Sequence, residues 1–401
     1  MLKKFKVENF YSIGDKQEIS MEITSKDVLD DSARQVQKGS TSLNLVACVI
    51  GANASGKTTM LKAMSFLFWF INNAYTSLKK ESKIPVNQHG LHKNESTKIE
   101  IDFFNNDVFY IYSIEFNREE VLKESLKRKN ERISLIFDLD RKAKNIFINT
   151  RTDLKINESD EIRFKQRRNV PLLSSLIDTG YLSEISFFKN FTSNVNQLGM
   201  MNYNIFFDFI SISRELQKNE VLCKKVLGFS KEIDLGISDF KFSERQFIEK
   251  NSMKEEKISV LECVHSSKQK IFSLPIFEES NGTQQYILIF LKISPILSTG
   301  GIVVLDELEH SLHPYAAKKI IALFENKETN PYNAQLIFST HSHLLLNDRT
   351  KTQIFIAEKN NVLSETEIYR LDSVEGIRND ENYFQKYTAG VYGGVPNVTW
   401  L

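Results

Sequence analysis

Apolar and polar residues follow patterns along the chain that predict buried strands and amphipathic helices. Residues 45–50 form a continuous apolar run, as expected for a strand buried on both faces. A short glycine-containing loop follows this run. Beyond the loop, apolar side chains recur at helical spacing, at Met60, Leu61, Met64, Leu67, Phe68 and Ile71. The pattern therefore predicts a strand–loop–helix unit.

The C-terminal part alternates between the two patterns. We predict helices over residues 284–297 and 314–326, and strands over residues 302–305, 335–340 and 353–358. Such alternation indicates an α/β fold, with a sheet wrapped by helices.

The remaining segments are assigned from local patterns. Residues 1–115 are β-rich, with a hairpin formed by residues 99–104 and 108–116. Residues 117–170 are charged, residues 171–235 are mostly helical, and residues 257–277 resemble a pair of strands. We therefore divide the chain into three parts: residues 1–116, a charged and helical insertion at 117–256, and residues 257–401.

The predicted strand–loop–helix unit carries a phosphate-binding motif. Its loop reads Gly51-Ala52-Asn53-Ala54-Ser55-Gly56-Lys57-Thr58, a full match to G-x-x-x-x-G-K-[ST], and Thr59 follows. The two glycines permit backbone N–H groups to surround a phosphate, and the helix presents its positive end to the anion. Lys57 can reach the β- and γ-phosphates, and the Thr58 hydroxyl can bind Mg²⁺. The motif predicts binding of a nucleoside triphosphate.

Two further strand ends carry polar groups that suit this ligand. The apolar run 302–305 ends in Asp306 and Glu307, which we expect to hold Mg²⁺ and to activate water, respectively. The run 335–340 ends at His341, which can hydrogen-bond the γ-phosphate. In a parallel sheet these ends meet at the edge that carries the phosphate loop.

A second anion site is predicted where Ser280, Asn281 and Gly282 begin a helix. The phosphate loop already holds the phosphates of one nucleotide. This second site is therefore expected to cap the γ-phosphate held by another copy of the chain.

Composition narrows the class of protein. The chain has 401 residues, with 52 basic and 51 acidic side chains, so any nucleic-acid contact must come from a local patch. Cys48, Cys223 and Cys263 form no C-x-x-C pair, which argues against a zinc site and a disulfide framework and suits a reducing cytoplasm. Neither a signal peptide nor an apolar run of membrane-spanning length is expected.

These motifs in this order resemble ABC-type ATPase heads of the RecF, SMC and OLD class. The Ser-x-Gly signature, Ser311-Leu312-His313-Pro314 and Ser339-Thr340-His341-Ser342 contribute to the resemblance. The chain is most similar to the AbiLi- or RloA-like ATP-binding proteins of abortive-infection and anti-phage systems. The segments that carry this resemblance to the subfamily are Phe5-Lys6-Val7-Glu8-Asn9-Phe10-Tyr11-Ser12, Leu235-Gly236-Ile237 and Tyr392-Gly393-Gly394-Val395-Pro396-Asn397.

The resemblance implies a P-loop ATPase head in which residues 1–116 and 257–401 form the two parts of the head. It implies ATP and Mg²⁺ as ligands, Thr58 and Asp306 at Mg²⁺, Glu307 as catalytic base and His341 as switch histidine. Ser280, Asn281 and Gly282 would act in trans in a homodimer or higher homo-oligomer. The glutamine that usually touches Mg²⁺ is not assigned, and Gln88 is a candidate. The segment after His341 is too short for the nuclease domain of OLD proteins, so a separate nuclease or toxin is expected as effector.

Two functions remain open at this point. One is an ATPase sensor that controls an effector in anti-phage defence, and the other is an ATP-dependent DNA-binding or scaffold protein of DNA repair. Basic residues favour a DNA contact, whereas interleaved glutamates favour a solvated charged face. The basic residues are Lys127, Arg128, Lys129, Arg132, Arg141 and Lys142, and the glutamates are Glu119, Glu120, Glu124 and Glu131. A transporter subunit is disfavoured, because the segment between phosphate loop and signature is too long.

Overall fold

A computed structural model provides the structure of the chain. It describes all residues except 24–32, 142–146, 151–153, 196–204, 234, 249–254, 267–269, 361–363 and 397–401. Lys142 and Asn397, which the sequence analysis considered, therefore lie outside the described residues. The chain divides into two compact units, which are described separately: Met1–Met200 with Ile296–Leu308 and Leu323–Leu401, and Met201–Pro295 with Glu309–Ala322.

The first unit contains a sheet that is parallel except at one edge. Over the described residues its strand order is β12-β16-β17-β6-β18-β19, and only β19 runs antiparallel to its neighbour. The strands are β6 (Val46–Gly51), β12 (Phe191–Ser193), β16 (Ile302–Leu305), β17 (Gln335–Thr340), β18 (Ile354–Lys359) and β19 (Thr366–Arg370). All residues of β6, β16 and β17 are buried, which explains their continuous apolar runs.

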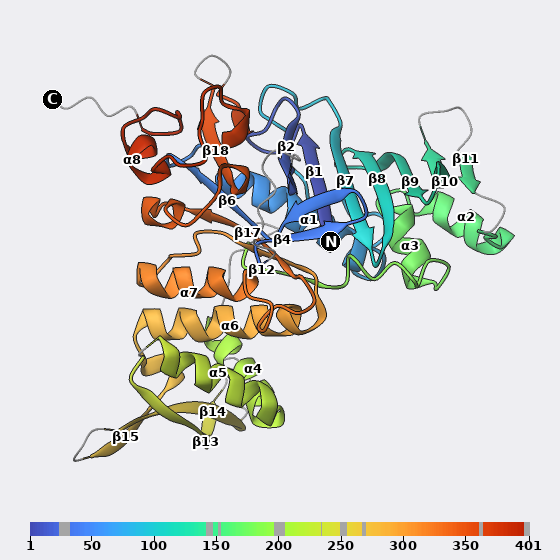
Figure 1. The fold of residues 1–401 in the computed structure, drawn as a ribbon. Coiled ribbons are helices and arrows are strands. Elements are labelled where there is room, and N and C mark those ends of the chain that lie inside the picture. Colours follow the sequence, from blue (N-terminus) through green and yellow to red (C-terminus); the bar gives the residue numbers. More distant parts are fainter. Residues whose placement is uncertain are drawn as a thin grey trace. The chain divides into compact units, whose positions relative to one another are not determined.

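The same unit contains a second, antiparallel sheet (Figure 1). Its order among the described strands is β11-β10-β9-β8-β7-β1-β2. These strands are β1 (Leu2–Glu8), β2 (Gln17–Ser20), β7 (Thr97–Asn105), β8 (Val108–Phe116), β9 (Val121–Lys129), β10 (Ile133–Asp140) and β11 (Phe147–Thr150). A small sheet is formed by β3 (Glu22–Ile23), β4 (Gln35–Lys38) and β5 (Thr41–Asn44). The predicted hairpin over residues 99–116 is confirmed as β7 and β8.

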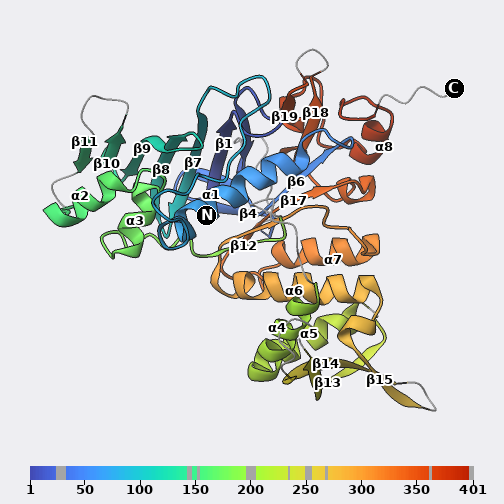
Figure 2. The same ribbon diagram turned by 180° about the vertical axis from the view of Figure 1, so that it is seen from behind.

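Helix α1 (Lys57–Ser77) packs against strands of both large sheets (Figure 2). It contacts β6, β16 and β17 of the parallel sheet and β1 of the antiparallel sheet. Phe66 stacks on Phe116 with ring centroids 5.6 Å apart, and Phe68 stacks on Phe191 at 4.1 Å. Because α1 is covered on several sides, its apolar residues extend beyond a single stripe. This packing holds the beginning of the helix, and hence the phosphate loop, in place.

The expectation of a charged and helical insertion at residues 117–256 is wrong for much of its length. Residues 121–150 contain β9, β10 and β11, which extend the antiparallel sheet. Most of their charged residues lie at exposed or half-buried positions beside buried ones such as Leu126 and Phe137, as in a sheet with one exposed face, whereas Glu124 is buried. Besides α1, the described residues of the first unit contain the helices α2 (Glu158–Gln166), α3 (Leu172–Asp178) and, near the C-terminus, α8 (Tyr383–Thr388).

The second unit combines helices with a hairpin. Helices α4 (Ile205–Lys218) and α5 (Glu220–Glu232) pack on β14 (Glu255–Ser266) and β13 (Ile237–Ile248), and β15 (Ile271–Pro275) pairs with β14. The Ser213 hydroxyl accepts a hydrogen bond from the Leu261 N–H at 2.8 Å, which fixes α4 on this sheet. Most of α6 (Asn281–Thr299) and α7 (Pro314–Phe324) belongs to this unit. The strands predicted over residues 257–277 are confirmed.

Candidate functional site

The phosphate loop and the predicted catalytic residues follow neighbouring parallel strands. In the order β12-β16-β17-β6, the strand that leads to His341 lies between the strand of the phosphate loop and the strand of Asp306. The register pairs Thr340 with Ile50 and Leu305 with Phe338. Carboxyl ends of parallel strands share one edge of a sheet. The structure thus brings residues 51–59, Asp306, Glu307 and His341 to one edge of the first unit.

Close contacts require glycine at the two motif positions Gly51 and Gly56 of the loop. A Cβ on Gly51 would lie 2.1 Å from the Ala357 carbonyl oxygen. Gly56 has φ +104°, and a Cβ there would lie 2.0 Å from Thr366 Oγ1. Neither position can accept a larger residue without movement of its neighbour. These contacts fix the loop between β6 and α1.

Lys57 and Ser55 provide polar atoms on the inside of the loop. The buried Lys57 ammonium donates hydrogen bonds to the carbonyl oxygens of Gly51 and Ala52, over 2.8 and 2.9 Å. The Ser55 hydroxyl is buried and has no hydrogen-bond partner among the described residues. A buried hydroxyl without a partner is costly, and a phosphate oxygen in the loop would satisfy it.

The hydroxyls that follow Lys57 differ in their surroundings. Thr58 is exposed at the start of α1, as expected for a residue that offers a ligand to Mg²⁺. Thr59 Oγ1 lies 2.9 Å from Ser12 Oγ, and Ser12 Oγ lies 2.8 Å from Thr366 Oγ1. This chain of hydroxyls connects the first turn of α1 to the start of β19.

The acidic pair is held by a serine of the neighbouring strand. Ser339 Oγ donates a hydrogen bond to Asp306 Oδ1 at 2.5 Å and accepts one from the Glu307 N–H at 2.8 Å. Glu307 has φ +48°, a strained conformation for a residue with a side chain, and such strain often accompanies function. The Glu307 side chain is about half exposed and can reach a ligand. The sequence analysis included Ser339 in a polar cluster but gave it no role.

His341 faces the candidate base. Its Nε2 atom lies 3.7 Å from Glu307 Oε1, and its side chain is partly exposed. Burial, with a smaller contribution from His341, lowers the pKa of the neighbouring His343. A neutral His343 adds no second positive charge beside the pair formed by His341 and Glu307.

Asn194, which directly follows β12, is a site residue that the sequence analysis missed. Its side-chain amide donates to the Asp306 carbonyl oxygen at 2.9 Å, and its Oδ1 accepts from the Asp306 N–H at 2.7 Å. This reciprocal pair fixes the backbone of the predicted Mg²⁺ ligand. Gln88 lies instead in the segment before β7, where the neighbouring Asn87 carbonyl accepts from the Tyr11 N–H. The sequence carried no signal for this contact, because the segment around Asn194 was expected to be helical and the pairing of β12 with β16 is set by the tertiary structure.

The predicted signature lies in the second unit. Ser280 precedes α6, and its hydroxyl accepts from the Thr283 N–H at 3.2 Å, as an N-cap does. Ser280 and Asn281 are exposed, whereas Gly282 is tightly packed, since a Cβ there would lie 2.8 Å from the Ser311 carbonyl oxygen. The helix begins three residues earlier than predicted, at Asn281 rather than Gln284.

The residues of the first unit fit a nucleotide with Mg²⁺. The loop offers N–H groups, an ammonium and a buried hydroxyl for phosphate, and Thr58 and Asp306 offer oxygen atoms, which Mg²⁺ prefers. No helix among the residues that the structure describes combines the length and the apolar character needed to cross a membrane.

Two of three comparisons with known proteins found a match. The family described as "AAA domain, putative AbiEii toxin, Type IV TA system" matches residues 46–347, well over half of the chain. Among solved structures, the SMC head domain from Thermotoga maritima is similar, with 15% sequence identity and a TM-score of 0.42, over 92% of this chain and 98% of that one. A search of curated proteins found no match. The predicted fold class, an α/β P-loop ATPase, is confirmed by the strand order and the family match.

Proposed function

Since the chain belongs to the family of AAA domains described as putative AbiEii toxins of type IV toxin–antitoxin systems, we propose that it hydrolyses ATP with Mg²⁺. The observation that carries this proposal is the hydrogen bonding of Ser339 to both Asp306 and Glu307, at the sheet edge that also bears the phosphate loop. A phosphate loop alone supports binding, whereas an oriented acid pair beside it supports hydrolysis.

In the proposed reaction, water attacks the γ-phosphorus while the bond between this atom and the bridging oxygen of ADP breaks. Glu307 orients the water and accepts its proton, and His341 contacts the γ-phosphate. Lys57 leaves the carbonyls of its own loop and binds the phosphates. Mg²⁺ bound by Thr58 and Asp306 would neutralise charge on the phosphate oxygens.

We further propose that two copies close around the nucleotide. The exposed Ser280 and Asn281 at the start of α6, with Gly282, suit contact with an anion held by a second chain. ATP would then join the copies and hydrolysis would separate them.

The proposed biological role is that of a regulator in the cytoplasm. Closure and opening of the dimer would control a separate effector, a nuclease or toxin, in anti-phage defence. The family description, which names a toxin–antitoxin system, supports this role. The AbiLi- or RloA-like subfamily remains part of the proposal.

Light scattering of the full chain with and without Mg-ATP tests the dimer. The Glu307→Gln variant should bind ATP, hydrolyse it far more slowly than wild type and double its mass only with Mg-ATP. The matched control is the double variant Lys57→Ala/Glu307→Gln, which should stay at the smaller mass. An unchanged mass of Glu307→Gln with bound ATP would contradict closure around the nucleotide, and unchanged turnover would contradict the role of Glu307.

Mixed variants test whether the signature acts in trans. Lys57→Ala and Ser280→Arg chains should each be inactive alone, because every composite site carries one defect. In a dimer of the two, one site carries both defects and the other carries none. An equal mixture should therefore recover about a quarter of wild-type turnover. No recovery, with mixed dimers demonstrated, would indicate that Ser280 acts within its own chain.

A second candidate function is ATP-dependent DNA binding or scaffolding. It is favoured by Lys127, Lys129 and Arg132, which are exposed around the turn from β9 to β10. Arg141 does not belong to this surface: it is buried and donates to the carbonyl oxygens of Val121 and Phe164. The set of basic residues that the sequence analysis considered for a DNA contact therefore loses Arg141.

Binding of duplex DNA as a function of salt distinguishes this function. If the three basic residues contact DNA phosphates, the logarithm of the binding constant should depend less steeply on the logarithm of the salt concentration when one of them is removed. The magnitude of this slope should fall by about 0.9 for each phosphate contact removed, for example in Lys127→Ala. The exposed Lys224 pairs with Glu220 on α5, and Lys224→Ala is the matched control. Equal salt slopes in both variants and wild type would show that this surface does not contact DNA.

A further inference from the structure

A second cluster of ligating side chains lies away from the acid pair, in the first unit. The described residues contain a group of three potential metal ligands, His89, His92 and Glu365. One ring nitrogen of each histidine and a carboxylate oxygen of Glu365 lie within 4.8 Å of one another. His92 Nε2 is 3.0 Å and His89 Nδ1 is 3.8 Å from the same atom, Glu365 Oε1. The cysteine pattern argues against a zinc site built from cysteines, but histidine and carboxylate are also zinc ligands, and we propose that these three residues bind a divalent transition-metal ion of the Zn²⁺ type.

The two histidines direct ring nitrogens toward the same carboxylate. His92 Nδ1 lies 2.8 Å from Glu95 Oε1 and therefore carries a proton, so Nε2, 3.0 Å from Glu365 Oε1, is the nitrogen that can bind an ion once it is deprotonated. His89 Nδ1 accepts a hydrogen bond from the Leu91 N–H at 3.3 Å, so it carries a lone pair that an ion would bind in place of this N–H. Two ring nitrogens and a carboxylate oxygen therefore converge. A bound cation would replace the second proton on His92 as the charge that offsets the Glu365 carboxylate.

The donor set and its spacing suit a first-row metal. Bonds of about 2.1 Å in tetrahedral geometry place ligand atoms about 3.4 Å apart, between the two observed distances. Two histidines and one carboxylate leave a coordination position for water. The contact of His92 with Glu95 is the carboxylate–histidine pairing that commonly orients a metal ligand.

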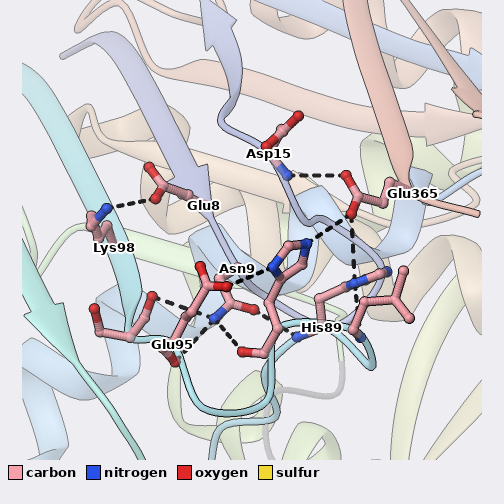
Figure 3. A network of polar contacts seen from close by, with 10 residues as sticks. Glu8, Asn9, Asp15, His89, Glu95, Lys98 and Glu365 are labelled. Carbon is pink, nitrogen blue, oxygen red and sulfur yellow. Dashed lines mark hydrogen bonds and ion pairs between the residues drawn. The ribbon is translucent and has the colours of Figure 1, made fainter. Parts of the chain in front are cut away.

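The backbone around the cluster is fixed before any ion binds. The buried Asn9 accepts from the His89 N–H at 2.8 Å and donates to the carbonyl oxygens of His92 and Glu95, each at 3.0 Å (Figure 3). Glu365 is buried, and its other oxygen accepts from the Asp15 N–H at 3.3 Å. A Cβ on Gly14 would lie 2.3 Å from the Glu365 carboxyl carbon, so a glycine is needed there. Such preorganisation lowers the cost of binding.

An ion at this position would act on the phosphate loop through Thr366, the residue after Glu365. The Thr366 N–H donates to the Ser12 carbonyl oxygen at 2.8 Å, and its hydroxyl contacts Ser12 Oγ. Thr366 also packs directly on Gly56. The ion would therefore join the segment of His89 and His92 to the strand that supports the loop. Its role is structural, and no step of ATP hydrolysis depends on it.

Titration with Co²⁺ and then Zn²⁺ tests the proposal, using full-length protein freed of metal with a chelator and without nucleotide or Mg²⁺. Wild type should bind one Co²⁺ per chain with the visible absorption of a low-coordinate site, and Zn²⁺ should displace it and raise Tm. His89→Ala and His92→Ala should each weaken binding by at least about tenfold, and Glu95→Gln by about tenfold. Glu95 is largely exposed, so this variant should keep the fold.

The matched control is His265→Ala. His265 also contacts a carboxylate, Glu279, at 2.7 Å, but belongs to no group of three ligands among the described residues. This variant should bind Co²⁺ as wild type does. The proposal is overturned if wild type shows no saturable Co²⁺ site, in which case a proton on His92 holds the cluster together. It is also overturned if folded His92→Ala and Glu95→Gln both bind Co²⁺ with wild-type affinity.

Discussion

The Ser339 hydroxyl donates a hydrogen bond to Asp306 Oδ1 over 2.5 Å, linking the ends of two neighbouring parallel strands. The same oxygen accepts from the Glu307 N–H. One buried side chain on β17 therefore orients both acidic residues that follow β16. This relationship connects the predicted Mg²⁺ ligand, the predicted base and the strand that leads to His341.

Removal of this hydroxyl should affect turnover more than binding. Ser339→Ala loses a hydrogen bond to a charged group, worth about 1.5–3 kcal/mol, so kcat should fall by about ten- to a hundredfold. The Kd for ATP should change little, because the phosphate loop is intact. Steady-state ATPase assays and calorimetry measure the two quantities. Ser373→Ala is the control, since the exposed Ser373 hydroxyl donates to the Arg370 carbonyl oxygen. An unchanged kcat would show that Ser339 does not position Asp306 or Glu307 for the reaction.

Asn194 should set the requirement for Mg²⁺. Without its reciprocal hydrogen bonds, the backbone of Asp306 loses its support, and Asn194→Ala should raise the Mg²⁺ concentration for half-maximal ATPase activity by about tenfold. Saturating Mg²⁺ should restore part of the lost activity. Asn117→Ala, which removes a half-buried side chain that caps a turn, is the matched control. If both variants respond to Mg²⁺ as wild type does, Asn194 has no influence on the metal ligand.

Gly56 should tolerate no side chain. Gly56→Ala combines a left-handed φ, costing about 1–2 kcal/mol, with a clash against Thr366 Oγ1. We expect loss of ATP binding in calorimetry and a lower Tm. Gly228→Ala is the comparison, because its Cβ would meet nothing within 4 Å on α5. That change should raise stability by up to about 1 kcal/mol and leave binding intact. Wild-type affinity in Gly56→Ala would contradict the loop geometry.

Glu124 should make stability depend on pH. Burial raises the pKa of its carboxyl from the ordinary value of 4.5 to about 7, although the N–H groups of Leu172 and Leu173 and the Tyr112 hydroxyl favour its charged form. Between these pH values the folded chain holds more protons than the unfolded chain. The free energy of unfolding should therefore fall as pH rises, by about 3 kcal/mol in total, and level off above pH 7.

The Glu124→Gln variant isolates this contribution, because its amide does not titrate. Urea unfolding of both proteins from pH 4.5 to 8 gives the difference in free energy of unfolding, wild type minus variant. This difference should decrease as pH rises through the interval and should be constant above it. A difference that stays flat would show that Glu124 has an ordinary pKa in the folded chain.

Local patterns in the sequence were sufficient for the parts of the protein that one segment forms by itself. The phosphate loop is contiguous, and its strand and helix follow from an apolar run and a helical period on either side. The strand ending in Asp306 and Glu307 was found in the same way. Periods of about 2 and 3.6 residues report which side of an element is buried, so fold class and the main site elements could be predicted.

The tertiary structure decided contacts between distant segments. The strand β9 was missed because consecutive charged residues, Lys123-Glu124 and Lys127-Arg128-Lys129, interrupt the alternation expected of a strand, and Glu124 is buried. Arg141 and Glu124 looked like surface charges, yet both are buried. Asn194 meets Asp306 across 112 residues, and His92 meets Glu365 across 273. Such pairs depend on strand order and register, which are set by packing of the whole core and leave no periodic trace in the sequence.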